Sequence, residues 1–261
     1  MHQPVVIIGM GEMGGVFARG LLRIGCPVYP VTRQMDLATV ANEIPEPQLV
    51  LVAVGEKDLH PVLSNIPQPW QGKLGLLQNE LLPRDWEHYG YQSVTAVPVW
   101  FEKKKGQDPK VLIPSPIFGP HASLLGAALS SLDIANRLLP DAQALLFELV
   151  CKNVYILTTN IAGLEAGGNV HQLWQQHREL AQEVAREVIL IQQHLTGKEF
   201  SAQDLIDGMV AGMNGDPEHQ CTGRSAPARL SRALEHADAA GLKVPALRRI
   251  HQQFGAGKTA A

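Results

Sequence analysis

Four β-branched residues that run directly into a glycine-rich turn constrain the fold of this chain more than any other feature. Residues 5–8 are all valine or isoleucine, and Gly9, Gly11 and Gly14 follow at G-x-G-x-x-G spacing. In nucleotide-binding turns of this kind the glycines permit a tight turn, a close approach of backbone to pyrophosphate, and close packing of the next helix. The stretch therefore predicts a strand, a turn and a helix that bind a dinucleotide, the alternative being a glycine-rich turn in some other α/β protein. The predicted cofactor-contacting residues are Gly9, Met10, Gly11, Glu12, Met13 and Gly14.

The residues after a second predicted strand, at 28–31, bear on which nicotinamide cofactor is bound. Sites for NAD usually carry an acidic residue at this place, where it binds the ribose hydroxyls. This chain instead has Thr32 and Arg33, and a guanidinium suits the bidentate binding of a 2′-phosphate. We therefore expect Thr32 and Arg33 to bind NADP(H) in preference to NAD(H). The alternative is that Arg33 is an ordinary surface arginine after a strand.

The rest of the first half alternates short apolar runs with helical segments, which is typical of a sheet built from βαβ units. The run at 49–54 is continuously apolar, as a strand covered on both faces requires. Further strands are predicted at 74–77, 93–101 and 111–113, with a helix at 58–65. The fold class is therefore α/β, with a Rossmann-type, mostly parallel sheet expected in a cofactor-binding domain of residues 1–140.

Beyond residue 140 the strand-like runs cease and helical periodicity takes over. Six apolar residues between Leu173 and Leu195, at spacings of three, four or seven, predict one long amphipathic helix. Ser201 and Asp204 resemble a capping box at the start of another helix. Residues 141–261 are therefore expected to form an all-helical C-terminal domain that carries the substrate side of the site.

Composition excludes several classes of function. The net charge is −3 and the sequence pI is near 6.4, so neither a nucleic-acid partner nor an anionic membrane is expected. The basic run Lys103–Lys105 is interpreted as a solvated loop. Cys26, Cys151 and Cys221 are odd in number and widely spaced, which argues against a disulfide framework and a zinc site and favours the reducing cytoplasm. No histidine spacing indicates a metal site, and no apolar stretch approaches the ~20 residues of a membrane helix.

A polar pair follows the predicted strand at 74–77 directly, at the strand end where ligands bind in open α/β sheets. In this pair, Gln78 and Asn79, the asparagine offers both a donor and an acceptor to a nicotinamide or to a substrate carbonyl. The alternative is that Asn79 is a turn residue that caps the next helix.

A short polar stripe marks the predicted helix over 147–163. Lys152, Thr159 and Asn160 fall within about a quarter turn of one another, while the residues around them are apolar. A lysine that faces a cleft can donate a proton to an oxygen that gains charge during hydride transfer. The alternative is that Lys152 reaches solvent or pairs with Glu148 one turn earlier.

The glycine turn, Arg33, Gln78–Asn79, Lys152 and Asn160 occur in an order that resembles the ketopantoate reductase (2-dehydropantoate 2-reductase) family, over nearly the whole chain. The resemblance implies a dinucleotide domain followed by an all-helical domain similar to that of 6-phosphogluconate dehydrogenase. It also implies an NADPH-dependent reductase in which Asn79 and Lys152 frame the 2-keto group. Lys152 would be the general acid and Asn160 would support it.

The departures from this family lie where the substrate would bind. Ile156 stands in place of a second asparagine, and Glu80 replaces the glycine after Asn79. The family's substrate-binding serine and glutamate fall near Met213 or Asn214 and at Ser225. The altered segment comprises residues 216–225. Within it, Cys221 is interpreted as an inert thiol, and Ser225 is interpreted as the N-cap of the next predicted helix. Arg224 lies just before this helix, at a helix N-terminus, which favours anions.

The leading hypothesis is thus an enzyme, an NADP-dependent oxidoreductase that reduces a small carbonyl compound, with a 2-oxo acid as the expected substrate held between the domains. The lost substrate residues also allow a non-catalytic NADPH-binding sensor. A third hypothesis is a dehydrogenase of the same two-domain group that acts on a 3-hydroxy acid or an imine. A small-molecule substrate is the expected partner, and a homodimer is compatible with the sequence.

Overall fold

The structure is a computed structural model that describes residues 3–255. The chain divides into two compact units, residues 1–149 and residues 150–261, which we call the sheet unit and the helical unit. The division falls inside the long helix α6 (Ala142–Ala166), rather than at residue 140, just after the last strand. The first two turns of α6 therefore pack with the sheet unit, which the change in sequence pattern at residue 140 does not reveal.

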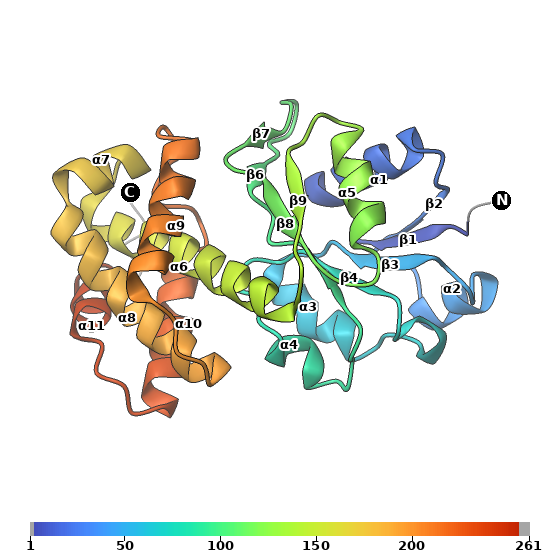
Figure 1. The fold of residues 1–261 in the computed structure, drawn as a ribbon. Helices are drawn as coiled ribbons and strands as arrows, with labels where there is room; N and C mark the ends of the chain where they lie inside the picture. Colours follow the sequence, from blue (N-terminus) through green and yellow to red (C-terminus); the bar gives the residue numbers. More distant parts are fainter. Residues whose placement is uncertain (1–2, 256–261) are drawn as a thin grey trace. The chain divides into compact units, whose positions relative to one another are not determined.

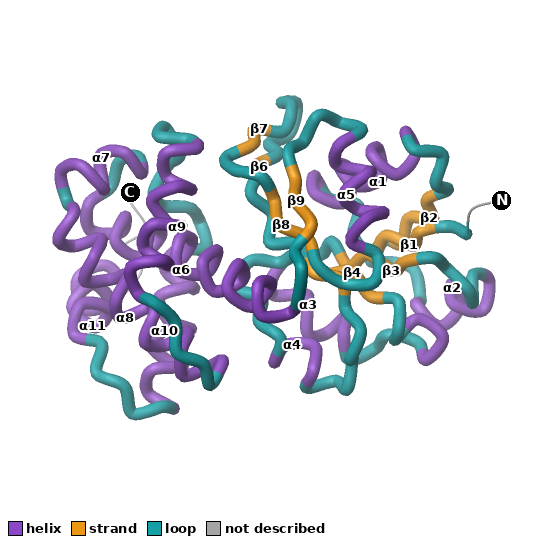
Figure 2. Tube along the Cα trace, viewed as in Figure 1, coloured by secondary structure: helices purple, strands orange, loops and turns teal. Residues whose placement is uncertain are grey.

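The sheet unit is built on five parallel strands in the order β2-β1-β3-β4-β5 (Figure 2). Their bounds are β1 (Val5–Ile8), β2 (Val28–Val31), β3 (Leu49–Val52), β4 (Leu74–Leu76) and β5 (Thr95–Ala96). The strands that follow β1 lie on both sides of it, so the chain reverses its direction across the sheet between β1 and β3. Open α/β sheets bind ligands at the carboxyl ends of the strands at such a switch point. The predicted Rossmann-type sheet is confirmed.

Helices cover both faces of this sheet, which explains why every residue of β1 and β3 is buried (Figure 1). Side chains that alternate along β1 and β3 pack on α1 (Glu12–Arg23) and α5 (Ala122–Ser130). The opposite face carries α2 (Leu37–Glu43), α3 (Glu56–Leu63) and α4 (Arg84–Glu87), with the short helix η1 (Gln68–Trp70) nearby. Gly20 lets α1 and α5 approach closely, because a Cβ there would lie 2.4 Å from the carbonyl oxygen of Ala128.

Two small strand pairs complete the sheet unit. They are the antiparallel β6 (Phe101–Glu102) and β7 (Lys110–Val111), and the parallel β8 (Ser115–Ile117) and β9 (Asn136–Leu138). The single strand predicted over 93–101 is wrong: β5 ends at Ala96, and β6 begins a separate pair at Phe101. Pro98, which has no N–H to donate to a sheet, lies in the interruption.

The helical unit contains most of α6 together with α7 (Val170–Gln176), α8 (Arg178–Thr196), α9 (Ala202–Gly215), α10 (Ala226–Ala239), α11 (Pro245–Ile250) and a terminal π-helical turn, η2 (His251–Gly255). The helix α8 packs against α7, α9, α10 and α11. Its Glu187 carboxylate accepts hydrogen bonds from the backbone N–H groups of Ala246 and Leu247, both at 2.9 Å. This contact caps the first turn of α11.

The prediction of a single long helix from Leu173 to Leu195 is wrong, because the helix is interrupted at His177. The backbone of His177 has φ −129° and ψ 37°, so α7 ends there and α8 begins at the next residue. Apolar spacing continues across the break, which is why periodicity alone does not detect it. Of the capping box predicted at the start of α9, the N-cap bond is present, since the Ser201 hydroxyl accepts from the Asp204 N–H at 3.2 Å.

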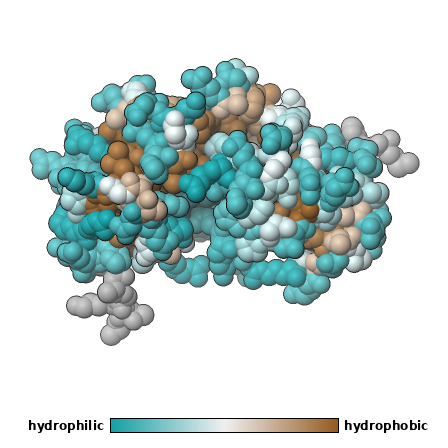
Figure 3. Space-filling model, turned by 90° about the horizontal axis from the view of Figure 1, so that it is seen from below, coloured by the Kyte–Doolittle hydropathy of each residue, from teal (hydrophilic) through white to brown (hydrophobic). Residues whose placement is uncertain are grey.

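Among the described residues, α6 is the helix long and apolar enough to cross a membrane, with a mean hydropathy of 1.3. Its most apolar window is 72% buried inside the molecule, as expected for the core helix of a helical unit. The molecular face drawn in Figure 3 is largely hydrophilic, with smaller apolar areas among the polar side chains. We therefore treat α6 as a core helix.

Candidate functional site

Each of the three glycines after β1 occupies a different structural environment. Gly9 has φ +97°, and a Cβ on it would lie 2.9 Å from the Ala53 carbonyl oxygen. A Cβ on Gly14 would lie 2.1 Å from the carbonyl oxygen of Gly9, so only glycine lets α1 start this close to the turn. Gly11 is the N-cap of α1, and a Cβ there would meet nothing within 4 Å. The turn is therefore packed at its first and third glycines and open at the second, where a ligand would approach.

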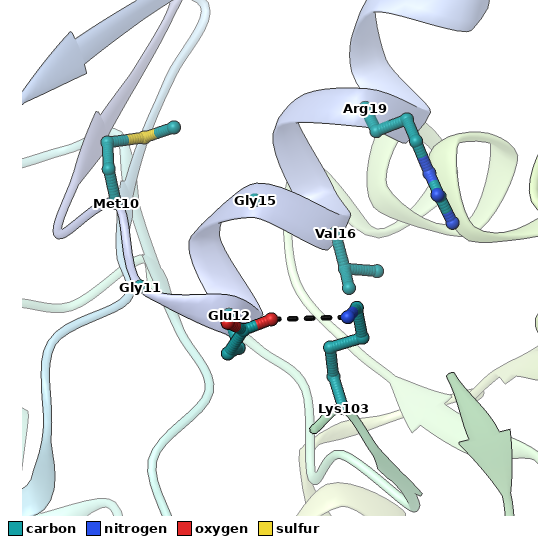
Figure 4. A pocket seen from close by; sticks show the side chains of 7 residues that line it. All are labelled: Met10, Gly11, Glu12, Gly15, Val16, Arg19 and Lys103. Atoms are coloured by element: carbon teal, nitrogen blue, oxygen red, sulfur yellow. Dashed lines mark ion pairs between the residues drawn. The ribbon is translucent and has the colours of Figure 1, made fainter. Parts of the chain in front are cut away.

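A cavity of about 220 Å³ opens beside Gly11 and the first turns of α1 (Figure 4). It is lined by Met10, Gly11, Glu12, Gly15, Val16, Arg19 and Lys103. Met13, also predicted to contact the cofactor, directs its side chain to the core of the sheet unit and leaves only its backbone at the turn. The lining of this cavity thus combines the N-terminus of α1, with its backbone N–H groups, and the two cationic side chains of Arg19 and Lys103.

The interpretation of Lys103–Lys105 as a solvated loop holds only for its last two residues, which are exposed. The side chain of Lys103 is 16% exposed, and its Nζ lies 3.2 Å from the Glu12 carboxylate in the cavity. The hairpin formed by β6 and β7 brings this lysine back to the N-terminus of α1. The residues are far apart in the sequence, and no local pattern indicates their contact.

Arg33 follows β2, as predicted, and its side chain is 80% exposed. Its Nη2 lies 2.7 Å from the carboxylate of Asp58, in the first turn of α3. Thr32 donates its backbone N–H to the Met35 sulfur at 3.5 Å. The cation predicted for a 2′-phosphate is therefore present, but it is paired with a carboxylate that sequence reasoning missed.

At the end of β4, Gln78 is buried and joins two strand ends. Its Nε2 donates to the Val52 carbonyl oxygen at 2.7 Å. Asn79 is half-buried, and its amide donates to the Glu56 carboxylate at 3.0 Å. The next helix, α4, has Pro83 as its N-cap, so the alternative role of Asn79 as a helix cap is wrong.

Glu80 keeps the backbone conformation that a glycine would adopt. Its φ is +62°, in the left-handed region that costs an L-residue about 1–2 kcal/mol. Asp133 is the other non-glycine residue with positive φ among those described. Glu80 therefore has, just after β4, a backbone conformation that glycine adopts without this cost.

In the helical unit, Lys152 lies on α6 and is only 8% exposed. Its Nζ is 5.5 Å from the centre of the Tyr155 ring, a cation–π contact that accommodates a buried ammonium. Glu148, the alternative partner one turn earlier, pairs with Arg137 instead, at 2.6 Å. Burial also contradicts the alternative in which Lys152 extends into solvent.

The other two members of the polar stripe have partners of their own. Thr159 donates its hydroxyl to the Tyr155 carbonyl oxygen at 2.8 Å, a bond within α6. The Asn160 side-chain oxygen accepts from Arg229 Nη1 at 2.7 Å, and both side chains are buried. Asn160 lies eight residues beyond Lys152, about 12 Å along the helix axis, so the amide and the ammonium occupy different levels of α6.

Arg229 is a buried charged residue of the helical unit that the sequence analysis did not single out. It lies on the buried stripe of α10, which includes Ala226, Leu230, Ala233 and Ala237. A cation in this stripe is a signal that the sequence does contain, because apolar faces of helices rarely carry arginine without a reason.

The altered segment before α10 does not restore the family's serine and glutamate. Met213 is buried in α9, and Asn214 is exposed. Ser225 occupies the N-cap position of α10 as predicted, although its side chain makes no capping hydrogen bond. Arg224, beside that N-cap, is exposed.

Cys221 is a packing residue in this structure. It is fully buried against Gly163 of α6, where a Cβ on the glycine would lie 2.5 Å from the Cys221 Cβ. Burial raises the pKa of the Cys221 thiol to about 11. The thiol is therefore protonated and unreactive at neutral pH, as predicted.

No protein-family model matches this chain, and no curated protein sequence matches it. Solved structures do. A probable 2-dehydropantoate 2-reductase from Bacillus subtilis is 15% identical, with a TM-score of 0.70 over 97% of this chain and 99% of its own. The ketopantoate reductase of Ralstonia eutropha JMP134 is 16% identical, with a TM-score of 0.67 over 96% and 97%. The dimeric ketopantoate reductase of Staphylococcus aureus is also 16% identical, with a TM-score of 0.63 over the same shares. The chain therefore has the fold of the ketopantoate reductases, a parallel sheet unit followed by a helical unit.

Proposed function

We propose that this protein is an NADPH-dependent reductase of a small carbonyl compound, with a 2-oxo acid such as ketopantoate as the first substrate to test. The observation that carries the proposal is the glycine turn, which is packed at Gly9 and Gly14 and open at Gly11. Structural neighbours named as ketopantoate reductases support the same class of reaction.

The residues of the sheet unit fit the proposed cofactor. The first-turn N–H groups of α1 would bind the pyrophosphate, and Arg33 would bind the 2′-phosphate. Asn79 would contact the nicotinamide end, since it follows β4 at the carboxyl edge of the sheet. When bound, NADPH supplies the hydride for carbonyl reduction.

We assign proton transfer to Lys152. Its ammonium would donate a proton to the carbonyl oxygen as that oxygen gains negative charge. The Lys152 ammonium lies 5.5 Å from the centre of the Tyr155 ring on the same helix.

The bonded pair of Asn160 and Arg229 would stabilise the helical side of the site. Nη1 of Arg229 donates to the Asn160 side-chain oxygen at 2.7 Å, and both side chains are buried. Asn160 would therefore support the site by fixing the position of Arg229.

The test is a substrate panel with NADPH absorbance as the readout. We expect oxidation of NADPH by at least one 2-oxo acid, and much less by the matching aldehyde that lacks the carboxylate. Tight NADPH binding without turnover of any compound would favour the non-catalytic sensor instead, which the loss of the serine and glutamate motivates. Reduction of imines alone by NADPH, or oxidation of 3-hydroxy acids alone when NADP⁺ is supplied as the hydride acceptor, would favour the third hypothesis.

Cofactor choice makes a separate prediction. Arg33→Ala should weaken NADPH binding about 10- to 100-fold, because it removes a charge-assisted hydrogen bond to the 2′-phosphate, and should leave NADH binding nearly unchanged. Asp58→Asn should strengthen NADPH binding, since Asp58 competes for Arg33. Isothermal titration measures both, with Arg23→Ala at the exposed end of α1 as the control. Equal losses for NADPH and NADH would contradict the assignment.

We further propose that the protein acts in the cytoplasm as a homodimer. None of the three cysteines forms a disulfide, and all three are buried, which suits a reducing compartment. The Staphylococcus aureus neighbour is named as dimeric.

A further inference from the structure

The cavity beside α1 contains an ion pair that the proposed function does not use. Glu12 occupies the first turn of α1, where its carboxylate would repel the pyrophosphate that the open turn is built to receive. Lys103 lies 3.2 Å from this carboxylate and lines the same cavity. We propose that Lys103 is a pyrophosphate-binding residue that is held by Glu12 before the cofactor binds and transfers its contact to the anion afterwards. This inference rests on the proposed function, namely that a dinucleotide binds at α1.

The position of the lysine is set by its own hairpin. Its Nζ donates to the Lys104 carbonyl oxygen at 2.8 Å, so the ammonium is held at the mouth of the cavity. At 16% exposure the side chain has lost most of its freedom, which a solvated lysine would keep. Its ordering therefore precedes any ligand.

The pair with Glu12 is weak enough to exchange. The Glu12 side chain is 45% exposed, and ion pairs at such solvent-exposed sites contribute little to stability. A pyrophosphate offers two negative charges at a helix N-terminus that already favours anions, so it competes well for the ammonium. A lysine suits this role because its ammonium is a compact charge on a flexible stem.

The second cation of the cavity strengthens the argument. Arg19 lies two turns further along α1 on the same face, and Figure 4 shows its side chain beside the cavity with Lys103 and Glu12. The cavity lining therefore has two cations against one carboxylate. This excess of positive charge matches an anionic ligand and does not match the uncharged nicotinamide ring or ribose.

Nucleotide titrations of Lys103→Ala test the inference, with Lys105→Ala, an exposed lysine of the same hairpin, as the matched control. We expect Lys103→Ala to weaken NADPH binding about 10-fold and to reduce its salt dependence, because one ammonium contact to the anion is lost. Binding of 2′-AMP, which carries the 2′-phosphate but no pyrophosphate, should not change. Glu12→Gln should strengthen NADPH binding severalfold, which a role for Lys103 in folding alone would not produce.

Two outcomes would overturn this role for Lys103 and leave the proposed function standing. In the first, Lys103→Ala and Lys105→Ala bind NADPH with equal affinity. In the second, Lys103→Ala weakens the binding of NADPH and of 2′-AMP equally. If the unaltered protein binds neither NADPH nor NADH, the proposed function and the role of Lys103 fail together. Urea unfolding of each variant ensures that the affinities compare folded proteins.

Discussion

Gly14→Ala is expected to destabilise the protein by about 3 kcal/mol, whereas Gly15→Ala, one residue further along α1, is expected to stabilise it by up to about 1 kcal/mol. The added methyl group at residue 14 would lie 2.1 Å from the Gly9 carbonyl oxygen, and neither atom can rotate away, because one belongs to the backbone and the other is attached directly to it. The methyl group at residue 15 would meet nothing within 4 Å. Alanine is also a better helix former than glycine.

Urea unfolding followed by tryptophan fluorescence measures this difference, because Trp70 and Trp100 are completely buried in the sheet unit. Gly14→Ala should also lose NADPH binding, since α1 must move away from the turn to accommodate the methyl group. Equal unfolding midpoints for the two variants would show that the turn is not as tightly packed as described.

Lys152→Ala is expected to reduce turnover of the carbonyl substrate by about 100- to 10,000-fold, the range typical of losing a general acid. NADPH affinity should remain within about twofold, since Lys152 is assigned to the carbonyl oxygen and not to the cofactor. Steady-state kinetics and direct titration of the same preparation separate the two effects.

Two further variants control for structure. Lys152→Met fills similar space without an ammonium, and it should lose as much activity as Lys152→Ala if proton donation is the cause. Lys198→Ala removes an exposed lysine from the helical unit and should leave turnover unchanged. Full turnover in Lys152→Met would remove Lys152 from the mechanism.

The elements nearest the glycine turn were predictable because their constraints are local. A β-branched run, glycines at fixed spacing and apolar residues at helical spacing each act within a few residues, and β1 and α1 form where they predict. The break at His177 was not predictable from apolar spacing, because that spacing continues through it and neither glycine nor proline marks it.

The candidate site was predictable only residue by residue. Asn79 and Lys152 could be singled out because polar groups stood out against apolar surroundings. The residues that these side chains bind could not be predicted from the sequence. Glu56 beside Asn79 and Arg229 beside Asn160 come from distant parts of the chain, and only packing of the elements brings them together.

The sequence by itself determined the glycine turn, the first four strands with the helix α1, and the change from an α/β to a helical pattern. The physical reason is that backbone freedom at glycine and side-chain periodicity are properties of short segments. Only the tertiary structure decided which charges meet. The β6–β7 hairpin brings Lys103 to Glu12, and the helix α3 brings Asp58 to Arg33, at the carboxyl end of the sheet. Electrostatic interactions act over a few ångströms in space, so they join residues that are far apart in the sequence.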